Sequence, residues 1–241
     1  MAFVRLFLAI ASLAILSNSA RALVGPTLDG AAYRTHVVMV LAQSGRGAGF
    51  CSGVTLAPNV VLTAAHCVAA PAATRVHFRD SNGAPVLMNV RRVARHPLYR
   101  ADAVQARAKS VDLALVETAG PLPEVFAATS IGEAIHQPGG AFDVVGFGVA
   151  RAGDASTSGV LRRARLALRA PISNVLLWLD SAEGAGACTG DSGAPVFSNG
   201  ALVAIVAFAQ GQHGRGCGGL TQAVRVAPYR NWVDATIAGW R

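Results

Sequence analysis

The stretch Val60-Val61-Leu62-Thr63-Ala64-Ala65-His66-Cys67 leads from four strand-like residues into a histidine and a cysteine, directly after the turn signal Pro58-Asn59. Short runs rich in Val and Leu recur along the chain, and turn residues separate them. Short strands punctuated in this way are typical of an all-β sandwich or barrel rather than of βαβ units. The expected strands are Thr35–Leu41, Gly53–Leu56, Val60–Thr63, Arg75–Phe78, Val86–Val93, Val111–Val116, Phe142–Phe147, Leu161–Leu168, Val175–Leu179 and Leu202–Phe208.

The chain divides into two β units at a loop-like stretch. Ala119–Gly140 contains three prolines and shows weak periodicity, which is typical of a connection. We expect one unit over residues 23–125 and a second over residues 126–241. A helical period occurs only in Ala227–Trp240, where apolar residues recur every three or four positions.

The composition excludes several classes of protein. Among 241 residues, 52% are hydrophobic and 14% are charged, which indicates a globular rather than a disordered chain. Lys109 is the only lysine, so a phosphate loop that needs a lysine is excluded. The four cysteines include no Cys-x-x-Cys pair, so a zinc site is not expected.

Residues 1–22 have the pattern of a signal peptide. Arg5 precedes the apolar run Leu6–Leu16, and Ala20-Arg21-Ala22 fits the small-x-small cleavage pattern. As a helix this run would rise about 16 Å, roughly half of a bilayer core. The alternative is a buried N-terminal helix. We expect a mature protein with no membrane anchor, secreted to the extracellular space or the periplasm, where disulfides are permitted.

The formal net charge of +8 raises the question of a polyanionic partner. Arg162, Arg163, Arg165 and Arg169 cluster, but aromatic residues do not alternate with them, so no nucleic acid is expected. Arg163, Arg165 and Arg169 share strand parity, which indicates a solvated strand face. A patch that docks on a polyanion is the alternative interpretation.

Three segments carry residues suited to nucleophilic catalysis: one with His66, one with Asp112 and one with Ser192. A serine hydroxyl needs an adjacent base, and that base needs an acid to fix its tautomer. The chain order His, Asp, Ser matches a known convergent arrangement. Asp102 competes with Asp112, but it lies in the polar stretch Arg100–Ser110, whereas Asp112 lies in an apolar strand where a carboxylate needs a partner.

These motifs resemble the chymotrypsin/trypsin family of serine endopeptidases, in the form of a secreted, bacterial-type member. The resemblance runs from about Leu23 to the C-terminus. It implies two antiparallel six-stranded Greek-key β-barrels with a short C-terminal helix, a monomer, a protein or peptide substrate, no cofactor and no metal. The matching residues are Ser52-Gly53, Leu62-Thr63-Ala64-Ala65-His66-Cys67, His96-Pro97-Leu98-Tyr99, Asp112-Leu113-Ala114-Leu115, Gly146-Phe147-Gly148, Gly190-Asp191-Ser192-Gly193-Ala194-Pro195, Arg225-Val226 and Trp232-Val233.

The catalytic roles are those that the family implies. Ser192 would attack the scissile carbonyl, with His66 as general base and then general acid. Asp112 would orient His66 and stabilise its charged form. The backbone N–H groups of Gly190 and Ser192 would form the oxyanion hole.

The family also implies two disulfides, Cys51–Cys67 and Cys188–Cys217. Four cysteines allow three connectivities, and the other two have no support from the family. Leu23-Val24-Gly25-Pro26 resembles the N-terminal segment of the active enzymes, whose amine pairs with the aspartate before the serine. Cleavage after Ala22 would expose Leu23 directly. We therefore expect export itself to create the ion pair of Leu23 with Asp191, without a separate zymogen step.

The family's spacing places Gly186 at the floor of the substrate pocket, so a strong preference for Arg or Lys is not expected. Ala207-Phe208-Ala209 stands where relatives carry Ser-Trp-Gly, and Ala209 should narrow the pocket. These residues favour a small or medium apolar side chain at P1, the residue before the scissile bond. The predicted pocket residues are Gly186, Ala187, Thr189, Ala207, Phe208, Ala209 and Thr221.

Three alternatives stay open at this point. His213, Arg215 or Arg225 could instead favour an acidic P1 side chain. Ala207 lacks the hydroxyl that relatives aim at the triad aspartate, which supports a protease-like binding protein without turnover. An esterase on the same scaffold would use the same acyl chemistry.

Overall fold

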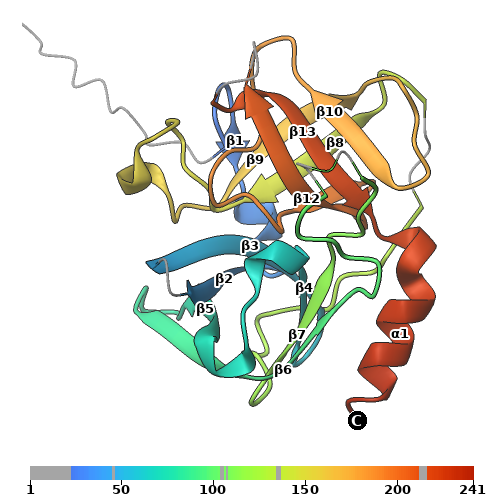
Figure 1. Ribbon diagram of the computed structural model, residues 1–241. Coiled ribbons are helices and arrows are strands. Elements are labelled where there is room, and N and C mark those ends of the chain that lie inside the picture. The colour runs from blue at the N-terminus through green and yellow to red at the C-terminus, as the bar shows by residue number, and fades with distance from the viewer. Residues whose placement is uncertain (1–22, 45–46, 104–105, 107, 134–136, 212–215) are drawn as a thin grey trace, which may run out of the picture.

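Two closed antiparallel β-barrels, each of six strands, form most of the molecule, and one helix follows them (Figure 1). The computed structural model describes residues 23–44, 47–103, 106, 108–133, 137–211 and 216–241. The predicted signal peptide, residues 1–22, lies outside the described residues. In the described part of the chain, no helix is long and apolar enough to cross a membrane.

The first barrel closes in the order β2-β3-β4-β7-β6-β5. Because β4 pairs with β7 rather than with the next strand in sequence, the connection has the predicted Greek-key form. The strands are β2 (Val37–Ser44), β3 (Gly47–Ala57), β4 (Val60–Thr63), β5 (Thr74–Arg79), β6 (Pro85–Arg95) and β7 (Ala114–Thr118).

The second barrel closes in the order β9-β10-β13-β12-β11-β8, with β8 paired to β9. A short extra strand, β1 (Leu28–Asp29), pairs with the edge of β9. The strands are β8 (Ala141–Gly146), β9 (Arg162–Leu168), β10 (Leu176–Asp180), β11 (Pro195–Ser198), β12 (Ala201–Gly211) and β13 (Gly218–Arg225).

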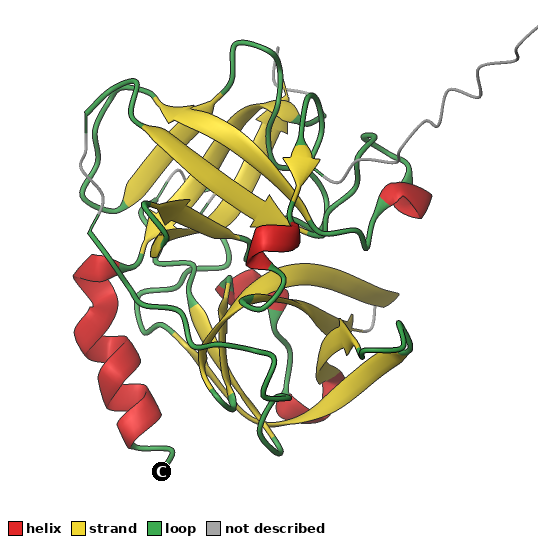
Figure 2. Ribbon diagram, turned by 180° about the vertical axis from the view of Figure 1, so that it is seen from behind, coloured by secondary structure: helices red, strands yellow, loops and turns green. Residues whose placement is uncertain are grey.

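Within the described residues, helical structure is confined to short turns and one C-terminal helix (Figure 2). The expected helix Ala227–Trp240 is a 3-10 turn followed by α1 (Arg230–Ala238). The 3-10 turns are η1 (Ala31–Tyr33), η2 (Ala65–Cys67), η3 (Pro71–Ala73), η4 (Ala155–Thr157) and η6 (Ala227–Tyr229).

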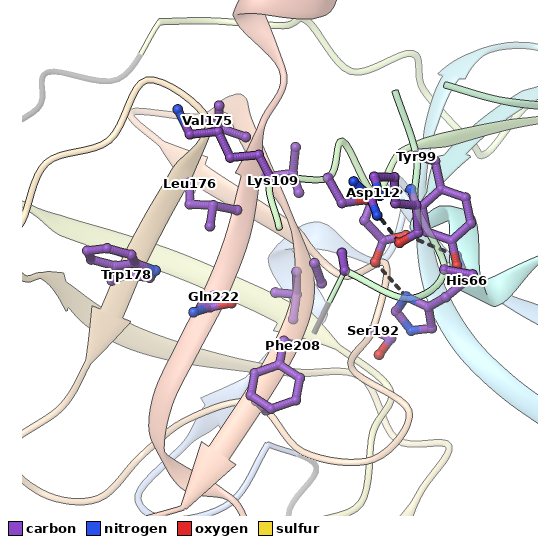
Figure 3. A pocket seen from close by; sticks show the side chains of 18 of the residues that line it. His66, Tyr99, Lys109, Asp112, Val175, Leu176, Trp178, Ser192, Phe208 and Gln222 are labelled. Atoms are coloured by element: carbon purple, nitrogen blue, oxygen red, sulfur yellow. Dashed lines mark hydrogen bonds and ion pairs between the residues drawn. The ribbon is translucent and has the colours of Figure 1, made fainter. Parts of the chain in front are cut away.

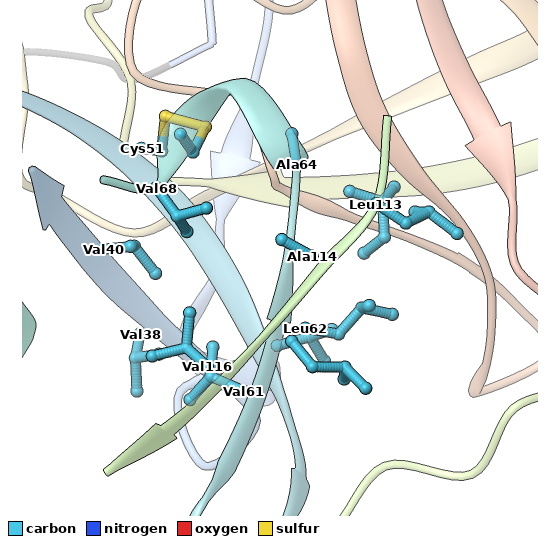
Figure 4. Packing of buried hydrophobic residues seen from close by; sticks show 14 of the residues in the cluster. Val38, Val40, Cys51, Val61, Leu62, Ala64, Val68, Leu113, Ala114 and Val116 are labelled. Carbon is cyan, nitrogen blue, oxygen red and sulfur yellow. A yellow bond between two sulfur atoms is a disulfide. The ribbon is translucent and has the colours of Figure 1, made fainter. Parts of the chain in front are cut away.

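Side-chain alternation explains the two cores. Along β9, buried residues alternate with more exposed ones, as expected when one face of a strand lines a barrel. In the first barrel Val38, Val61 and Val116 are almost fully buried and lie together on one side of β4, and the buried Leu62 lies on its other side (Figure 4). Burial of such side chains stabilises the fold by about 1.5–3 kcal/mol each.

The prediction that Asp112 lies within a strand is wrong. The strand β7 begins at Ala114, and the Leu113 N–H donates to the carbonyl of Val111 at 2.9 Å. A bond between residues two positions apart closes a γ-turn, so the chain cannot continue a β-ladder there. Asp112 therefore lies in the turn that leads into β7.

The arginine cluster forms a solvated strand face in part. The Arg163 and Arg165 side chains are 30% and 66% exposed, and both contact Asp143. Arg169 is 58% exposed and pairs with Asp180 at 3.1 Å. The fourth member, Arg162, is buried. Two aspartates thus lie beside these three arginines and offset part of their charge.

The first and the last described segments each pack on the barrel that is more distant in sequence. The N-terminal strand β1 joins the second barrel, whereas Trp240 lies against Arg92 of the first, 5.6 Å from the guanidinium carbon to the ring centroid. Arg92 donates to the Trp240 carbonyl and to the carboxylate of Glu117. The division at residue 125 stays a prediction, and both terminal segments cross it.

The Arg92–Glu117 pair gives a test of this C-terminal attachment. Arg92→Leu leaves the Glu117 carboxylate, which is 3% exposed, without its cation. We expect the free energy of unfolding to fall by about 2–3 kcal/mol, measured by denaturant titration. Addition of Glu117→Leu should recover much of the loss. Arg151→Leu, which removes an exposed pair with Asp154, should have no measurable effect; equal losses in both arginine variants would contradict the expectation.

Candidate active site

The first barrel positions a histidine and an aspartate side by side. His66 lies in η2, directly after β4, and Asp112 precedes β7. Because β4 and β7 pair with Thr63 opposite Ala114, the ends of these two strands meet. His66, Asp112 and Ser192 line one cleft of about 950 Å³. Ser192 belongs to the second barrel's loop before β11, so the cleft lies between the barrels.

Asp112 holds His66 through both of its carboxylate oxygens. His66 Nδ1–H donates to Oδ2 at 2.6 Å, and the His66 backbone N–H donates to Oδ1 at 2.9 Å. A carboxylate only accepts hydrogen bonds, so the proton of the neutral ring is on Nδ1. Nε2 then carries the lone pair that a general base needs.

Asp102 is not the partner of His66. It is 63% exposed and pairs with Arg100 at 3.1 Å, and this guanidinium lowers the pKa of the Asp102 carboxyl. Asp112, by contrast, is only 14% exposed. The preference for Asp112 over Asp102 therefore agrees with the geometry.

Ser192 is half-buried, and Figure 3 shows its side chain beside the His66 ring. In the described part of the chain no hydrogen bond joins the two side chains, and His66 Nε2 lies 3.7 Å from Cys67 Sγ. Catalytic hydrogen bonds are often long before substrate binds and tighten in the complex. The arrangement therefore fits a resting site.

The loop around Ser192 depends on two glycines in the left-handed region. Gly190 and Gly193 have φ of +93° and +79°. A Cβ on Gly193 would lie 2.1 Å from the Ser52 carbonyl oxygen and 2.1 Å from Thr63 Oγ1. The N–H groups of Gly190 and Ser192 donate to no acceptor in the described part of the chain, so they are free to bind an anion.

Asp191 lies under this loop as a fully buried carboxylate. Its oxygens accept hydrogen bonds from the backbone N–H groups of Gly148, at 2.9 Å, and Cys188, at 3.0 Å. Burial raises the pKa of Asp191 to about 7, although these hydrogen bonds and the charge of Arg162 oppose the rise. Asp191 therefore requires a further cation to be fully ionised at neutral pH.

The predicted partner, Leu23, is also fully buried in the second barrel. Val24 exchanges backbone hydrogen bonds of 3.0 and 3.1 Å with Gly186, which fixes the N-terminal segment. Here the Leu23 nitrogen is a peptide nitrogen bonded to Ala22, so it carries no charge to pair with Asp191. The ion pair stays a prediction for the processed chain.

Both disulfides implied by the resemblance are formed, Cys51–Cys67 and Cys188–Cys217, with S–S distances of 2.01 and 1.97 Å. The Cys51 and Cys67 sulfurs and a His66 ring nitrogen lie within 4.8 Å of one another. Because the two sulfurs share a disulfide, they offer no thiolate ligands, and this cluster does not fit a metal ion.

The predicted pocket residues fall into two groups. Thr189, Ala207, Phe208 and Ala209 line the cleft. Gly186, Ala187 and Thr221 are buried and are not among its lining residues.

The backbone contacts around Gly186 explain this recess. Thr221 Oγ1 accepts from the Ala187 N–H at 3.0 Å. A Cβ on Gly186 would lie 3.1 Å from the Gly218 Cα. Gly186 is therefore packed against the backbone of Gly218, which leaves little room for a side chain between them. Of the residues considered for an acidic P1 side chain, His213 and Arg215 lie outside the described residues, and Arg225 donates to the Ser173 carbonyl at 3.4 Å.

The outer wall of the cleft was not predicted. Leu176 and Trp178 on β10 line it together with Gln222 on β13 and with Lys109, whose side chain extends toward Val175 and Leu176 (Figure 3). Alternation along β10 could have indicated outward-facing Leu176 and Trp178, since Leu177 and Leu179 are buried. Nothing local in the sequence places Gln222 beside Trp178.

A histidine–aspartate pair facing a serine across two closed barrels is the arrangement of chymotrypsin-like serine hydrolases. A family model described as Trypsin matches residues 28–233. The chain belongs to the trypsin family of serine proteases and is a serine endopeptidase of the hydrolase class, a family that acts on proteins and peptides.

Three similar proteins come from animals. Serine protease 1 of Canis lupus familiaris is 26% identical over 212 residues, covering 80% of this chain and 82% of that protein. Trypsin Blo t 3 of Blomia tropicalis is 26% identical over 218 residues, covering 78% and 77%. Trypsin, alkaline B of Manduca sexta is 26% identical over 263 residues, covering 95% and 98%. The expectation of a bacterial-type member finds no support among them.

Solved structures share the fold at low identity. The scabies mite inactivated protease paralogue S-D1 superposes with a TM-score of 0.73 at 20% identity, covering 90% of this chain and 97% of that one. Human heparin binding protein gives 0.69 at 20% identity, covering 88% and 94%. Mouse neuropsin gives 0.68 at 20% identity, covering 83% and 93%. At this identity the likeness shows the fold alone.

The crowding around Gly193 gives a test of the nucleophile loop. Gly200 has a similar φ of +78° but open space around its missing Cβ, so Gly200→Ala measures the backbone strain by itself. We expect Gly200→Ala to lower the free energy of unfolding by about 1–2 kcal/mol. Gly193→Ala should cost about 1–3 kcal/mol more, because it adds steric overlap. If chemical denaturation gives the same loss of unfolding free energy for both variants, the loop rearranges to accommodate the added Cβ and the expectation is wrong.

Proposed function

We propose that the protein hydrolyses peptide bonds through an acyl-enzyme on Ser192, with His66 as general base and acid. The observation that carries the proposal is the His66–Asp112 pair, with Nδ1 donating at 2.6 Å, in the same cleft as Ser192. Two backbone N–H groups that donate to no acceptor in the described residues, those of Gly190 and Ser192, support it.

In the acylation step, Ser192 Oγ attacks the scissile carbonyl carbon, and its proton passes to His66 Nε2. The carbonyl oxygen becomes an oxyanion, which accepts hydrogen bonds from the Gly190 and Ser192 N–H groups. His66 then gives the proton to the leaving amine as the C–N bond breaks. Asp112 stabilises the imidazolium that forms in between.

In the deacylation step, a water molecule loses a proton to His66 Nε2 and attacks the ester carbonyl carbon. The same two N–H groups hold the second oxyanion. As the bond from carbon to Ser192 Oγ breaks, His66 returns the proton to Oγ. The balanced reaction is hydrolysis of one amide bond, with no cofactor.

For the P1 side chain we propose a preference for uncharged residues of small to medium size. The cleft beside Ser192 is lined by Thr189, Ala207 and Ala209, and none of them carries a charge. Gly186 is packed against Gly218, so this side of the pocket offers no acidic group for an Arg or Lys side chain.

We also propose that the mature chain is exported and begins at Leu23. The Leu23 amine would then supply the cation that the buried Asp191 carboxylate needs. Two observations support this: Leu23 is fully buried, and Val24 exchanges backbone hydrogen bonds with Gly186.

Peptide-library cleavage by purified residues 23–241 tests the mechanism. Ser192→Ala should abolish cleavage, and Asp112→Asn should lower kcat by about four orders of magnitude because the histidine tautomer is lost. Asp102→Asn is the matched control and should retain activity. The cleaved sites should carry small or medium apolar P1 residues.

Other results would point elsewhere. Arg or Lys winning outright at P1 would refute the uncharged pocket. Hydrolysis confined to ester substrates would favour the esterase alternative. No hydrolysis by processed, disulfide-intact protein would favour the binding protein without turnover, with Ala207 as the first position to examine.

The raised pKa of Asp191 predicts a pH effect that depends on the N-terminus. In a chain N-acetylated at Ala22, the unfolded Asp191 ionises near its ordinary pKa of 3.8, whereas the folded group stays protonated until about pH 7. The contribution of Asp191 to the free energy of unfolding is therefore fully present below pH 3.8 and is lost as the pH rises toward 7. The free energy of unfolding should fall by about 3 kcal/mol between pH 4 and 7.

Two comparison chains complete this experiment. In a chain that begins at Leu23, the free amine lowers the pKa of Asp191, so the decline should disappear from urea unfolding curves. Asp191→Asn should remove it from the acetylated chain. Equal pH dependence of the acetylated chain and the chain beginning at Leu23 would rule out the proposed ion pair.

A further inference from the structure

The cleft continues beyond Ser192 along the outer face of the second barrel. Trp178 on β10 lies opposite Gln222 on β13, and Gln222 lies opposite Phe208 on β12. Directly opposed residues on neighbouring strands project from the same face of a sheet. These three side chains line the cleft together with Leu176 and form one mostly apolar wall (Figure 3).

A loop of the first barrel forms the opposite wall. Ala101, Ala103 and Ala108 line the cleft there, so most of this wall is small and apolar as well. Among the described residues of this segment, Arg100 and Lys109 also line the cleft. Among the described lining residues, the walls are thus mostly apolar, and the segment before Asp112 adds positive charge to them.

Most of the charged groups of the groove have partners within the chain. Arg100 pairs with Asp102 at 3.1 Å, and Asp112 holds His66 at 2.6 Å. Lys109 is exposed and forms no ion pair with any residue of the described part of the chain. In Figure 3 its side chain projects over the groove on the side of Leu176. An anion that entered the groove would therefore find the Lys109 ammonium available.

The path of a substrate decides which of its side chains meets Lys109. A P1 side chain enters the pocket beside Thr189 and Ala209 of the second barrel. Side chains of an extended peptide alternate in direction. The residues two and four positions before the scissile bond, P2 and P4, therefore point toward the first barrel's loop, and P3 points away from it.

We propose that Lys109 selects peptide substrates that carry an acidic side chain at P2 or P4. The inference rests on the proposed endopeptidase function and adds the charge class of the substrate. The exposed Lys109 ammonium attracts a carboxylate that enters the groove, because it forms no ion pair with any described residue. Removal of the Lys109 charge leaves the His66–Asp112 pair untouched, so the effect concerns substrate choice.

Fluorogenic tetrapeptides test the inference. Each carries the P1 residue that the library selects and either Glu or Gln at P2, P3 or P4 in turn. The wild-type chain of residues 23–241 should prefer Glu by about three- to ten-fold in kcat/KM at P2 or P4, and show no preference at P3. An increase in NaCl from about 0.05 to 0.5 M should shrink this preference, because salt screens exposed charges.

Charge variants identify the residue that is responsible. Lys109→Gln should bring the Glu and Gln peptides to equal rates, and Lys109→Glu should favour peptides with Lys at the same position. Arg100→Gln is the matched control, because it removes a cation of the same wall whose guanidinium already pairs with Asp102. The preference for Glu should survive in that variant.

The outcomes separate this inference from the proposed function. Equal rates for Glu and Gln at every position, or a preference that survives Lys109→Gln, would overturn the role of Lys109 while leaving the endopeptidase intact. If no peptide is cleaved, fluorescence anisotropy with labelled peptides and Ser192→Ala protein replaces the rates. The Glu peptide should then bind more tightly than the Gln peptide, and Lys109→Gln should abolish the difference; equal affinities would again overturn the inference.

Discussion

The geometry of the site depends on one buried carboxylate. Asp191 binds two backbone N–H groups, one from Gly148 and one from Cys188, and so fixes the loop that carries Ser192. Its oxygens occupy the space where side chains would begin at Gly146 and Gly148, since a Cβ at either glycine would lie 2.3 Å from one of them. The motif Gly146-Phe147-Gly148 is therefore the receptor for this carboxylate. Because desolvation opposes ionisation of the group, the order of the nucleophile loop is coupled to whichever cation offsets the charge.

Strand β3 connects the two halves of the site. Neighbouring residues of a strand point to opposite sides, and Cys51 and Ser52 use the two sides differently. The Cys51 disulfide holds Cys67, next to His66, against the strand. The Ser52 N–H donates to the Ser192 carbonyl at 2.8 Å, and its hydroxyl donates to the Gly190 carbonyl at 3.0 Å. One strand therefore sets the separation of base and nucleophile before any direct contact between them forms.

The features of the fold and the site that could be predicted are those that a short stretch of sequence encodes. The strand Val60–Thr63 was predicted with its observed bounds, because its apolar run and its turn lie in one stretch of chain. The position of Asp112 outside β7 was missed, since a γ-turn between Val111 and Leu113 is a backbone choice that an apolar pattern does not reveal. The recess of Gly186 and the outer wall at Trp178 depend on the register of β10, β12 and β13. Register between strands that are distant in sequence is a tertiary property, and composition carries little information on it.

The hydrolytic residues of the cleft are tightly constrained by their neighbours, whereas Lys109 is not. The hydrolytic groups lie on segments that hydrogen bonds, a disulfide and a buried carboxylate hold in place. An atom added in these segments, such as a Cβ at Gly193, would overlap with neighbouring atoms. Lys109 lies only three positions before Asp112, yet it is exposed and paired to no described residue, whereas Asp112 is 14% exposed and bound through both oxygens. Substitutions of exposed residues usually change the free energy of unfolding by less than about 0.5 kcal/mol. The charge of the groove can therefore change without a loss of fold or of the His66–Asp112 geometry, which allows substrate choice to vary on a fixed hydrolytic site.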